Sequence, residues 1–180
     1  MFTSYISLGS NIGNREKHII TAMRHLKTRV EIEKTSGLYE TEPYGYKDQN
    51  EFINCVAKIR TDMTPPVLLD RLLRIEAEMG RVRKFKWGPR VIDLDILLYE
   101  DFISNSESLT IPHKDMQNRI FILKPLIEIE PELIHPVLKK SVSQLYEKLL
   151  NESKEAFKCV NYKNEVLLSA VPAEVKPGRF

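Results

Sequence analysis

Features that would assign this chain to several common classes are absent or scarce in its sequence. It contains only two cysteines, Cys55 and Cys159, which lie far apart and outside any CxxC or Cys/His pattern. Neither a disulfide framework nor a zinc site is therefore indicated. No apolar run approaches the roughly 18 residues of a membrane span, and the N-terminus lacks the charged and apolar regions of a secretory signal. These absences predict reduced thiols and a cytoplasmic protein with no membrane partner.

The sequence also has little net charge and lacks the known nucleotide-binding motifs. The net charge of +2 is too small to indicate a nucleic-acid surface by itself, so any electrostatic function must come from local clusters. Neither a GxxxxGK[ST] loop nor a GxGxxG fingerprint occurs, and there are no internal repeats. The 180 residues, 42% hydrophobic and 29% charged, instead have the composition of one folded domain.

The order of the expected elements predicts an α+β fold. Strands are expected over residues 3–8, 30–39, 52–61 and 91–99, with one helix after Asn14 and another between Thr64 and Gly80. This β-α-β-β-α-β order is the ferredoxin-like pattern, with an antiparallel sheet. A loop or hairpin at 100–114 and helices at 115–129 and 142–150 then cover the second face, which gives three layers.

The domain organisation follows from these elements. We expect a single domain over residues 1–150, followed by a tail, residues 151–180, that is not an independent domain. The tail is expected to hold a hairpin around residues 161–164 and to end in a mobile stretch that contains proline and glycine. No function is assigned to it.

A dense basic cluster stands between the second helix and the fourth strand. Residues 79–92 contain no acidic side chain, and their cations are Arg81, Arg83, Lys84, Lys86 and Arg90. Phe85 and Trp87 are interleaved with them and Gly88-Pro89 follows, so the cluster is expected to be an exposed loop. A solvated loop without function is the simpler interpretation of such a cluster taken alone.

Two carboxylates interrupt the aliphatic strand that follows this cluster. Asp93 and Asp95 stand at i and i+2, so they share one strand face at a separation of about 7 Å along the backbone. Both could simply face solvent from a half-exposed strand. Beside the basic cluster, however, they suit Mg²⁺, which takes oxygen ligands. Carboxylates for a metal and cations for phosphate oxygens favour an ATP-dependent phosphoryl-type transferase.

The segment from Trp87 to Leu97, WGPRVIDLDIL, resembles the signature of the 6-hydroxymethyl-7,8-dihydropterin pyrophosphokinase family. The similarity extends to Gly9-Ser10-Asn11 and to residues 80–84, 110–113 and 118–121, and it spans most of the expected domain. The resemblance implies that the β,γ-diphosphate of ATP is transferred to the hydroxymethyl oxygen of 6-hydroxymethyl-7,8-dihydropterin. AMP and the pterin diphosphate would be the products, in a step of folate biosynthesis.

The resemblance also implies roles for individual residues. Asp93 and Asp95 would bind two Mg²⁺ ions, and Asp95 would be catalytic together with Arg81 and Arg90. The nucleotide would be held by Glu76, Arg83, Lys84, Trp87, Thr110, His113 and Arg119. The pterin would be held by Thr41, Glu42, Tyr44, Phe52, Asn54 and Phe121. Strand alternation agrees in part, because it places Phe52 and Asn54 on the face opposite the apolar residues at 53, 55, 57 and 59.

Two other functions fit parts of the sequence. A β-α-β-β-α-β unit with a basic, aromatic-containing loop also suits an RNA-binding module of the RRM type. Its third strand, however, has no RNP1-like aromatic run, and the aspartate pair would repel phosphate in the absence of a metal. A catalytically silent relative is disfavoured because Asp93, Asp95, Arg81, Arg90 and His113 are all present. The expected partners are therefore ATP and the pterin, without nucleic acid, and we expect a monomer.

Overall fold

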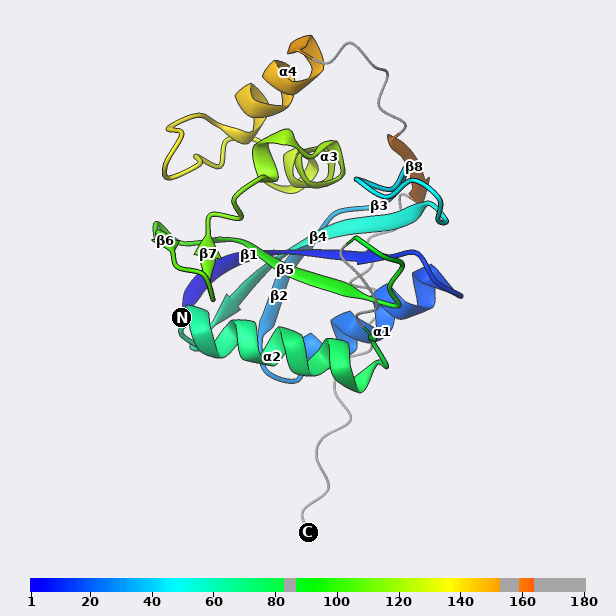
Figure 1. Cartoon of the computed structure of the whole chain (residues 1–180). Coiled ribbons are helices and arrows are strands. Elements are labelled where there is room, and N and C mark those ends of the chain that lie inside the picture. The colour runs from blue at the N-terminus through cyan, green and yellow to red at the C-terminus, as the bar shows by residue number, and fades with distance from the viewer. Residues whose placement is uncertain (83–86, 153–158, 164–180) are drawn as a thin grey trace.

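One antiparallel sheet between two layers of helices forms most of the structure (Figure 1). A computed structural model describes residues 1–82, 87–152 and 159–163. The strands of the sheet are β1 (Phe2–Ser10), β2 (Glu31–Thr35), β3 (Leu38–Thr41), β4 (Phe52–Thr61), β5 (Asp93–Tyr99) and β8 (Cys159–Lys163). They lie in the order β5-β1-β4-β3-β8, and β2 also pairs with β4.

The helices cover both faces of this sheet. The helices α1 (Arg15–Lys27) and α2 (Pro65–Glu78) lie on one face, and α3 (Ile120–Ile129) lies on the other, with α4 (Val142–Glu152) packed on the outer side of α3 (Figure 1). The hairpin of β6 (Ser104–Asn105) and β7 (Thr110–Ile111), followed by a 3₁₀ turn at Met116–Asn118, connects β5 to α3. The predicted β-α-β-β-α-β core, its antiparallel sheet and its three layers are therefore confirmed.

Each face of the sheet has its own apolar core, because successive side chains of a strand point to opposite faces. On β4, Cys55 and Ala57 pack towards α1 and α2, whereas Val56 packs towards α3 and α4. The first core takes Met23 from α1, and the second takes Leu126 from α3, both fully buried. Burying one such side chain contributes roughly 1.5–3 kcal/mol, so both helical layers are fixed to the sheet.

The predicted ends of the first two helices are confirmed. The Asn14 side chain caps α1 by accepting a hydrogen bond from the Lys17 amide at 3.0 Å, which satisfies a donor that has no partner within the helix. Pro65 is the first residue of α2. Gly80 follows α2 with a φ of +81°, a left-handed conformation that suits glycine after a helix.

The single strand expected over residues 30–39 is wrong in one respect, because the structure divides it into β2 and β3. Between them, Ser36 pairs with Val56 through its amide at 2.9 Å and through its hydroxyl oxygen, which accepts from the Val56 amide at 3.0 Å. The Gly37 amide turns instead to the carboxylate of Glu128 on α3, with both oxygens at 3.0 Å. A side chain from another layer thus interrupts the ladder.

The helix expected over residues 115–129 is also interrupted. After the 3₁₀ turn, Arg119 has extended backbone angles, φ −116° and ψ 104°, and α3 begins only at Ile120. The carboxylate of Asp115 accepts hydrogen bonds from the Asn118 amide group at 3.0 Å and from Arg119 Nε at 3.2 Å. These local side-chain bonds compete with helical backbone bonding and fix the side chain of Arg119.

Part of the tail belongs to the sheet. Residues 159–163 form β8, which pairs antiparallel with β3 in the register Thr41↔Cys159 and Tyr39↔Asn161. The hairpin expected around residues 161–164 has this strand as its described part, and its remainder, with residues 164–180, lies outside the described part of the chain. Among the helices in the described ranges, none is long and apolar enough to cross a membrane.

Candidate active site

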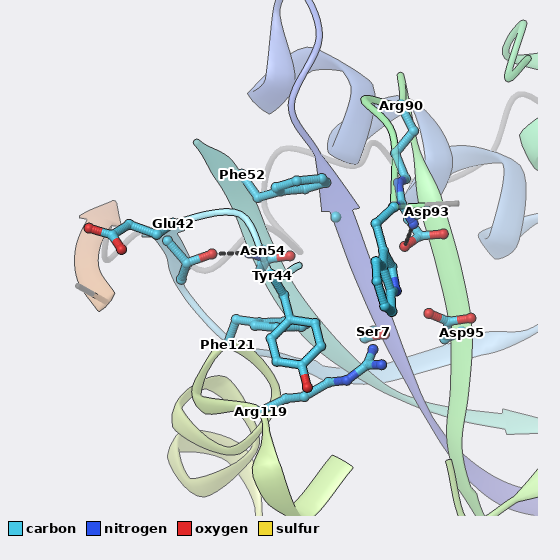
Figure 2. A pocket seen from close by; sticks show the side chains of 13 residues that line it. Ser7, Glu42, Tyr44, Phe52, Asn54, Arg90, Asp93, Asp95, Arg119 and Phe121 are labelled. Carbon is cyan, nitrogen blue, oxygen red and sulfur yellow. Dashed lines mark hydrogen bonds and ion pairs between the residues drawn. The ribbon is translucent and has the colours of Figure 1, made fainter. Parts of the chain in front are cut away.

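A cleft opens on the α3 face of the sheet, beyond the area that α3 and α4 cover (Figure 2). On this face Tyr5, Val56 and Leu97 pack beneath the two helices. On the same face of each strand, the residues two and four positions from these three, towards the cleft, are polar, aromatic or small instead of aliphatic. The lining residues are Ser7, Gly9, Thr41, Glu42, Tyr44, Phe52, Asn54, Trp87, Arg90, Asp93, Asp95, Arg119 and Phe121.

Strand register places the polar lining residues in rows across the sheet. Gly9 on β1 lies opposite Asn54 on β4 and opposite Asp93 on β5. Ser7 lies opposite Asp95. Adjacent strands are about 5 Å apart, so the Asn54 amide and the aspartate pair lie two strands apart at the base of one cleft.

One end of the cleft is aromatic. Phe52 and Phe121 lie on opposite sides, with Asn54 at the base between them, and Tyr44 lies over Phe121 with ring centroids 6.4 Å apart (Figure 2). The Glu42 side chain points away from the cleft (Figure 2), so that residue offers the cleft its backbone. Rings on two sides and an amide at the base suit a flat, polar heterocycle.

The Asn54 side chain is held in one orientation. It is 7% exposed, and its Nδ2 donates to the Thr41 hydroxyl at 2.7 Å. A Cβ at Gly9 would lie 2.7 Å from Asn54 Oδ1, closer than real Cβ contacts allow, so only glycine at position 9 leaves room for this oxygen. The sheet thus presents a fixed acceptor at the base of the aromatic end.

The other end carries a chain of alternating charges. The buried carboxylate of Glu76 on α2 binds Arg81, and its Oε1 also accepts from the Leu94 amide at 2.8 Å. Arg81 Nη1 lies 2.6 Å from Asp93 Oδ1, and Arg90 Nη1 lies 2.6 Å from Asp93 Oδ2. Arg90 also lies over the Phe52 ring at 5.6 Å. Two guanidinium groups therefore meet at the boundary between the charged and aromatic ends.

Asp95 differs from Asp93 in its environment. Burial, with the nearby charges of Asp93 and Glu76, raises the pKa of Asp95 to about 7. Within residues 1–82, 87–152 and 159–163, the structure records no hydrogen bond or ion pair to its carboxylate. Such a group gains from a bound cation, which would remove the cost of its charge.

Arg119 faces this carboxylate from the opposite side of the cleft (Figure 2). Its guanidinium carbon lies 5.2 Å from the Tyr44 ring centroid and 5.7 Å from that of Phe121. Asp115 holds its Nε, and the positive charge of Arg119 opposes the rise in the pKa of Asp95. Arg119 therefore adds a third guanidinium at the same boundary.

His113 lies near this charged end without lining the cleft. Its amide donates to the Leu97 carbonyl at 2.9 Å, and its Nδ1 accepts from the Asp115 amide at 3.3 Å. Burial first, and then the charge of Arg119, lower the pKa of His113 to about 4. The ring is therefore neutral at pH 7, and an accepting Nδ1 leaves its proton on Nε2.

Comparison with known proteins assigns the chain to a family. Residues 5–131 match the family described as 7,8-dihydro-6-hydroxymethylpterin-pyrophosphokinase (HPPK). The chain belongs to the HPPK family. A pyrophosphokinase from Aquifex aeolicus, "2-amino-4-hydroxy-6-hydroxymethyldihydropteridine pyrophosphokinase", is 43% identical over 80% of this chain and 90% of its own length. The protein of that name from Haemophilus influenzae is 46% identical over 76% of this chain and 86% of its own length.

The fold is also found in solved structures. A crystal structure of a Plasmodium falciparum HPPK-DHPS triple mutant superposes with a TM-score of 0.72 at 20% identity, over 92% of this chain and 46% of that longer chain. At this identity the likeness supports the fold alone. The family match and the closer relatives make the chain an ATP-using pyrophosphokinase of folate biosynthesis.

The structure brings together most of the residues that the HPPK resemblance selected. All six residues expected at the pterin line the cleft, and so do Trp87, Arg90, Asp93, Asp95 and Arg119. Arg81 is 10% exposed and contacts Asp93 from behind the lining. Arg83 and Lys84 lie outside the described residues.

Two residues expected at the nucleotide lie elsewhere in the structure. The Glu76 carboxylate is 4% exposed and is occupied by Arg81 and the Leu94 amide. Thr110 lies in the β6–β7 hairpin, where its hydroxyl donates to the Ser106 carbonyl at 3.2 Å. Neither side chain is among the lining residues of the cleft, and their contact with nucleotide stays a prediction.

Sequence reasoning missed Ser7 and Gly9 as lining residues of the cleft. Both lie in the first expected strand or just after it, and Gly9 is part of the Gly9-Ser10-Asn11 segment that carried the HPPK resemblance. The alternation of side chains along a strand could have identified them, because Tyr5, Ser7 and Gly9 share one face. The pairing of β1 with β4 and β5 was needed to place that face between Asn54 and Asp95.

Proposed function

We propose that this cleft binds the pterin at its aromatic end and the ATP phosphates at its charged end, and that the β,γ-diphosphate passes to the hydroxymethyl oxygen of 6-hydroxymethyl-7,8-dihydropterin. AMP and the pterin diphosphate are the products. The observation that supports this proposal is the row Asn54, Gly9 and Asp93, in which the amide at the aromatic end and a carboxylate at the charged end lie two strands apart.

The aromatic end selects the pterin ring in this proposal. Phe52 and Phe121 stack on its faces, and the fixed Oδ1 of Asn54 accepts from its amide-like edge. Backbone groups of Thr41, Glu42 and Tyr44 complete the set of partners. A ring without the matching donors leaves the buried amide unpaired, and that penalty supplies specificity.

Asp93 and Asp95 are proposed to hold Mg²⁺, with two ions as the family resemblance implies. The donor set of two carboxylates fits, because Mg²⁺ commonly takes one or two carboxylates, with phosphate and water oxygens completing its shell. The raised pKa of Asp95 indicates a carboxylate that a cation would stabilise. When bound, Mg²⁺ supplies charge neutralisation for the phosphates.

The chain's own cations act on the transferring group. Arg81 and Arg90 are held 2.6 Å from Asp93, so their guanidinium groups are already oriented at the boundary where the diphosphate must cross. Arg119 approaches the same place from the α3 side. Phosphoryl-type transfer depends mainly on positioning and on stabilising charge, and three oriented guanidinium groups supply both.

His113 is proposed to donate a hydrogen bond rather than a proton. Its lowered pKa keeps the imidazole neutral, and the accepting Nδ1 leaves Nε2–H free to donate to a phosphate oxygen. Glu76 is proposed to act through Arg81, which it anchors, and not through the nucleotide.

The reaction products test this proposal. The protein is incubated with ATP, Mg²⁺ and 6-hydroxymethyl-7,8-dihydropterin, and nucleotides are separated by ion-exchange chromatography. We expect AMP to form in a 1:1 ratio with the pterin diphosphate, and no AMP to form when the pterin is omitted. Formation of ADP in place of AMP would mean transfer of a single phosphoryl group and would overturn the proposal.

A further inference from the structure

Ser7 is a polar side chain at a position where packing favours an apolar one. It lies on β1 directly opposite Val56 of β4, and Tyr5 precedes it on the same strand face. Both of these neighbours are buried in the apolar core that α3 covers. An aliphatic side chain at position 7 would extend that core and would contribute the free energy of burying more apolar surface. Packing therefore does not account for a hydroxyl at this position.

The hydroxyl of Ser7 also differs from those of the two other serines of β1. Ser4 Oγ donates to the Leu98 carbonyl at 2.8 Å, and Ser10 Oγ lies 3.4 Å from His18 Nδ1. Across the described part of the chain, no hydrogen bond to Ser7 Oγ is recorded. Ser7 lines the cleft, so its hydroxyl is available to a molecule that binds there.

The place of Ser7 in the sheet is the boundary between the two ends of the cleft. Its strand lies between β4 and β5, and Ser7 is directly opposite Asp95 of β5, an arrangement in which Cβ atoms are about 4.5–5.5 Å apart. Asn54 of β4 lies opposite Gly9, so it is the diagonal neighbour of Ser7, at about 7–8 Å between Cα atoms. Figure 2 shows Ser7 at the base of the cleft, on the strand between those that carry Asn54 and Asp95.

The proposed substrate brings one neutral polar group to this boundary. When the amide-like edge of the pterin is at Asn54, the hydroxymethyl group lies at the other end of the ring system, because its carbon is attached to the second ring. It must face the charged end of the cleft, where the diphosphate arrives. The carboxylates and guanidinium groups of that end are assigned to metal and phosphate. The hydroxyl of Ser7 is the neutral partner that matches an alcohol there.

We propose that Ser7 is a specificity-determining residue of this reaction, whose Oγ accepts a hydrogen bond from the hydroxymethyl O–H of the pterin and orients that oxygen for attack. This role rests on the proposed function of the cleft. A serine hydroxyl can donate or accept. An accepting Oγ leaves the lone pairs of the attacking oxygen directed at the phosphorus, whereas a donating Oγ would occupy one of them. Orientation of a reacting oxygen contributes to rate as well as to binding.

Three substitutions separate the hydroxyl from its position. Ser7→Ala removes one oxygen atom that has no recorded partner in the described residues, so the fold should be retained. Ser7→Thr keeps the hydroxyl on a β-branched side chain, which suits a strand. Thr3→Ala is the matched control, because it removes a hydroxyl from the same strand at a position that is not among the lining residues of the cleft. Thermal unfolding of the three variants checks that they are folded.

The contact is measured with two ligands that differ in this group alone. The protein is titrated by calorimetry, without ATP, with 6-hydroxymethyl-7,8-dihydropterin and with 6-methyl-7,8-dihydropterin, which lacks the hydroxyl. We expect the wild type and Thr3→Ala to bind the hydroxymethyl compound about three- to tenfold more tightly, the size of one neutral hydrogen bond. In Ser7→Ala this ratio of affinities falls close to one, and in Ser7→Thr it recovers. A structural effect at position 7 would weaken both compounds alike and leave the ratio unchanged, which would refute the contact.

The orienting role is measured by the rate of AMP release at saturating ATP and pterin. In Ser7→Ala we expect kcat to fall at least about fivefold, with the KM for ATP unchanged, and Ser7→Thr should restore most of kcat. A wild-type kcat in folded Ser7→Ala overturns the orienting role.

The titrations also separate this proposal from the proposed function. A wild-type protein that binds neither pterin overturns the proposed function, and the role of Ser7 with it. A wild-type protein that binds both pterins equally well, or whose preference survives in Ser7→Ala, overturns the role of Ser7 alone.

Discussion

Replacing Glu76 by glutamine distinguishes an anchor for Arg81 from a direct contact with nucleotide. The Glu76 and Arg81 side chains are 4% and 10% exposed, and Glu76 Oε1 also accepts from the Leu94 amide. Glutamine retains an oxygen that can accept from that amide. What the substitution removes is the negative partner of a buried guanidinium, whose remaining partner is Asp93.

The magnitude follows from this loss. Removing one partner of a buried ion pair costs roughly 3–5 kcal/mol, because the other charge is left buried. Asp93 still compensates Arg81 and the glutamine oxygen still accepts, so we expect the free energy of unfolding to fall by about 2 kcal/mol. Most domains have about 5–15 kcal/mol in total, so the variant remains folded and can be assayed.

Urea unfolding checks the anchor, with Glu78→Gln as the matched control on the same helix. The Glu78 side chain is 49% exposed in its pairs with His25 and Arg71, so its loss should cost below about 1 kcal/mol. ATP binding of folded Glu76→Gln is then measured by calorimetry. If its stability matches the wild type while ATP binding is clearly weaker, Glu76 contacts the nucleotide and the reasoning is refuted.

Three further predictions follow from the site and its surroundings. Asp95→Asn should lose nearly all turnover even at high Mg²⁺, measured as AMP release, and near-normal turnover in a folded variant would contradict a metal role for the pair. Asn54→Ala should weaken pterin binding by roughly 1–3 kcal/mol with ATP binding almost unchanged, and calorimetry showing equal losses for both ligands would exclude a dedicated pterin contact. Glu130 accepts from Lys58 at 2.7 Å, and this bond lowers the pKa of Glu130 below its ordinary value of 4.5. Its contribution to stability is therefore present above about pH 4.5 and is lost as the pH falls through the lowered pKa. Glu130→Gln should make the acid branch of stability against pH shallower, and an identical slope in urea titrations from pH 6 to 3 would show that the pair does not act this way.

Local patterns were enough to predict the parts of the fold in which sequence neighbours decide the outcome. Alternation along β4 placed Phe52 and Asn54 on the face opposite the apolar residues at 53, 55, 57 and 59. The i, i+2 spacing placed Asp93 and Asp95 on one side of β5. The Asn14 cap and the Pro65 start of α2 rest on interactions within a few residues. The order of the elements along the chain was enough to predict one antiparallel sheet with a helical layer on each face.

Contacts between distant segments account for what the sequence did not predict. The interruption between β2 and β3 at Ser36-Gly37 involves Glu128 of α3, which lies 91 positions from Gly37 in the sequence. The extended backbone of Arg119 depends on Asp115, whose side-chain bonds outcompete the expected helix. The hydrogen bond from Asn11 Nδ2 to Gln49 Oε1 spans 38 positions, and no periodicity or motif reports such a pair.

The pairing of β8 with β3 has a consequence for synthesis of the protein. The strand β3 carries Thr41, the partner of Asn54 in the cleft, and in the described part of the chain its outer edge pairs with residues 159–163. During synthesis, all lining residues of the cleft have been added to the chain once Phe121 has been made. The backbone groups on that edge nevertheless stay open to any other extended chain until Lys163 has emerged. The late strand therefore covers backbone groups that could otherwise pair with a neighbouring chain.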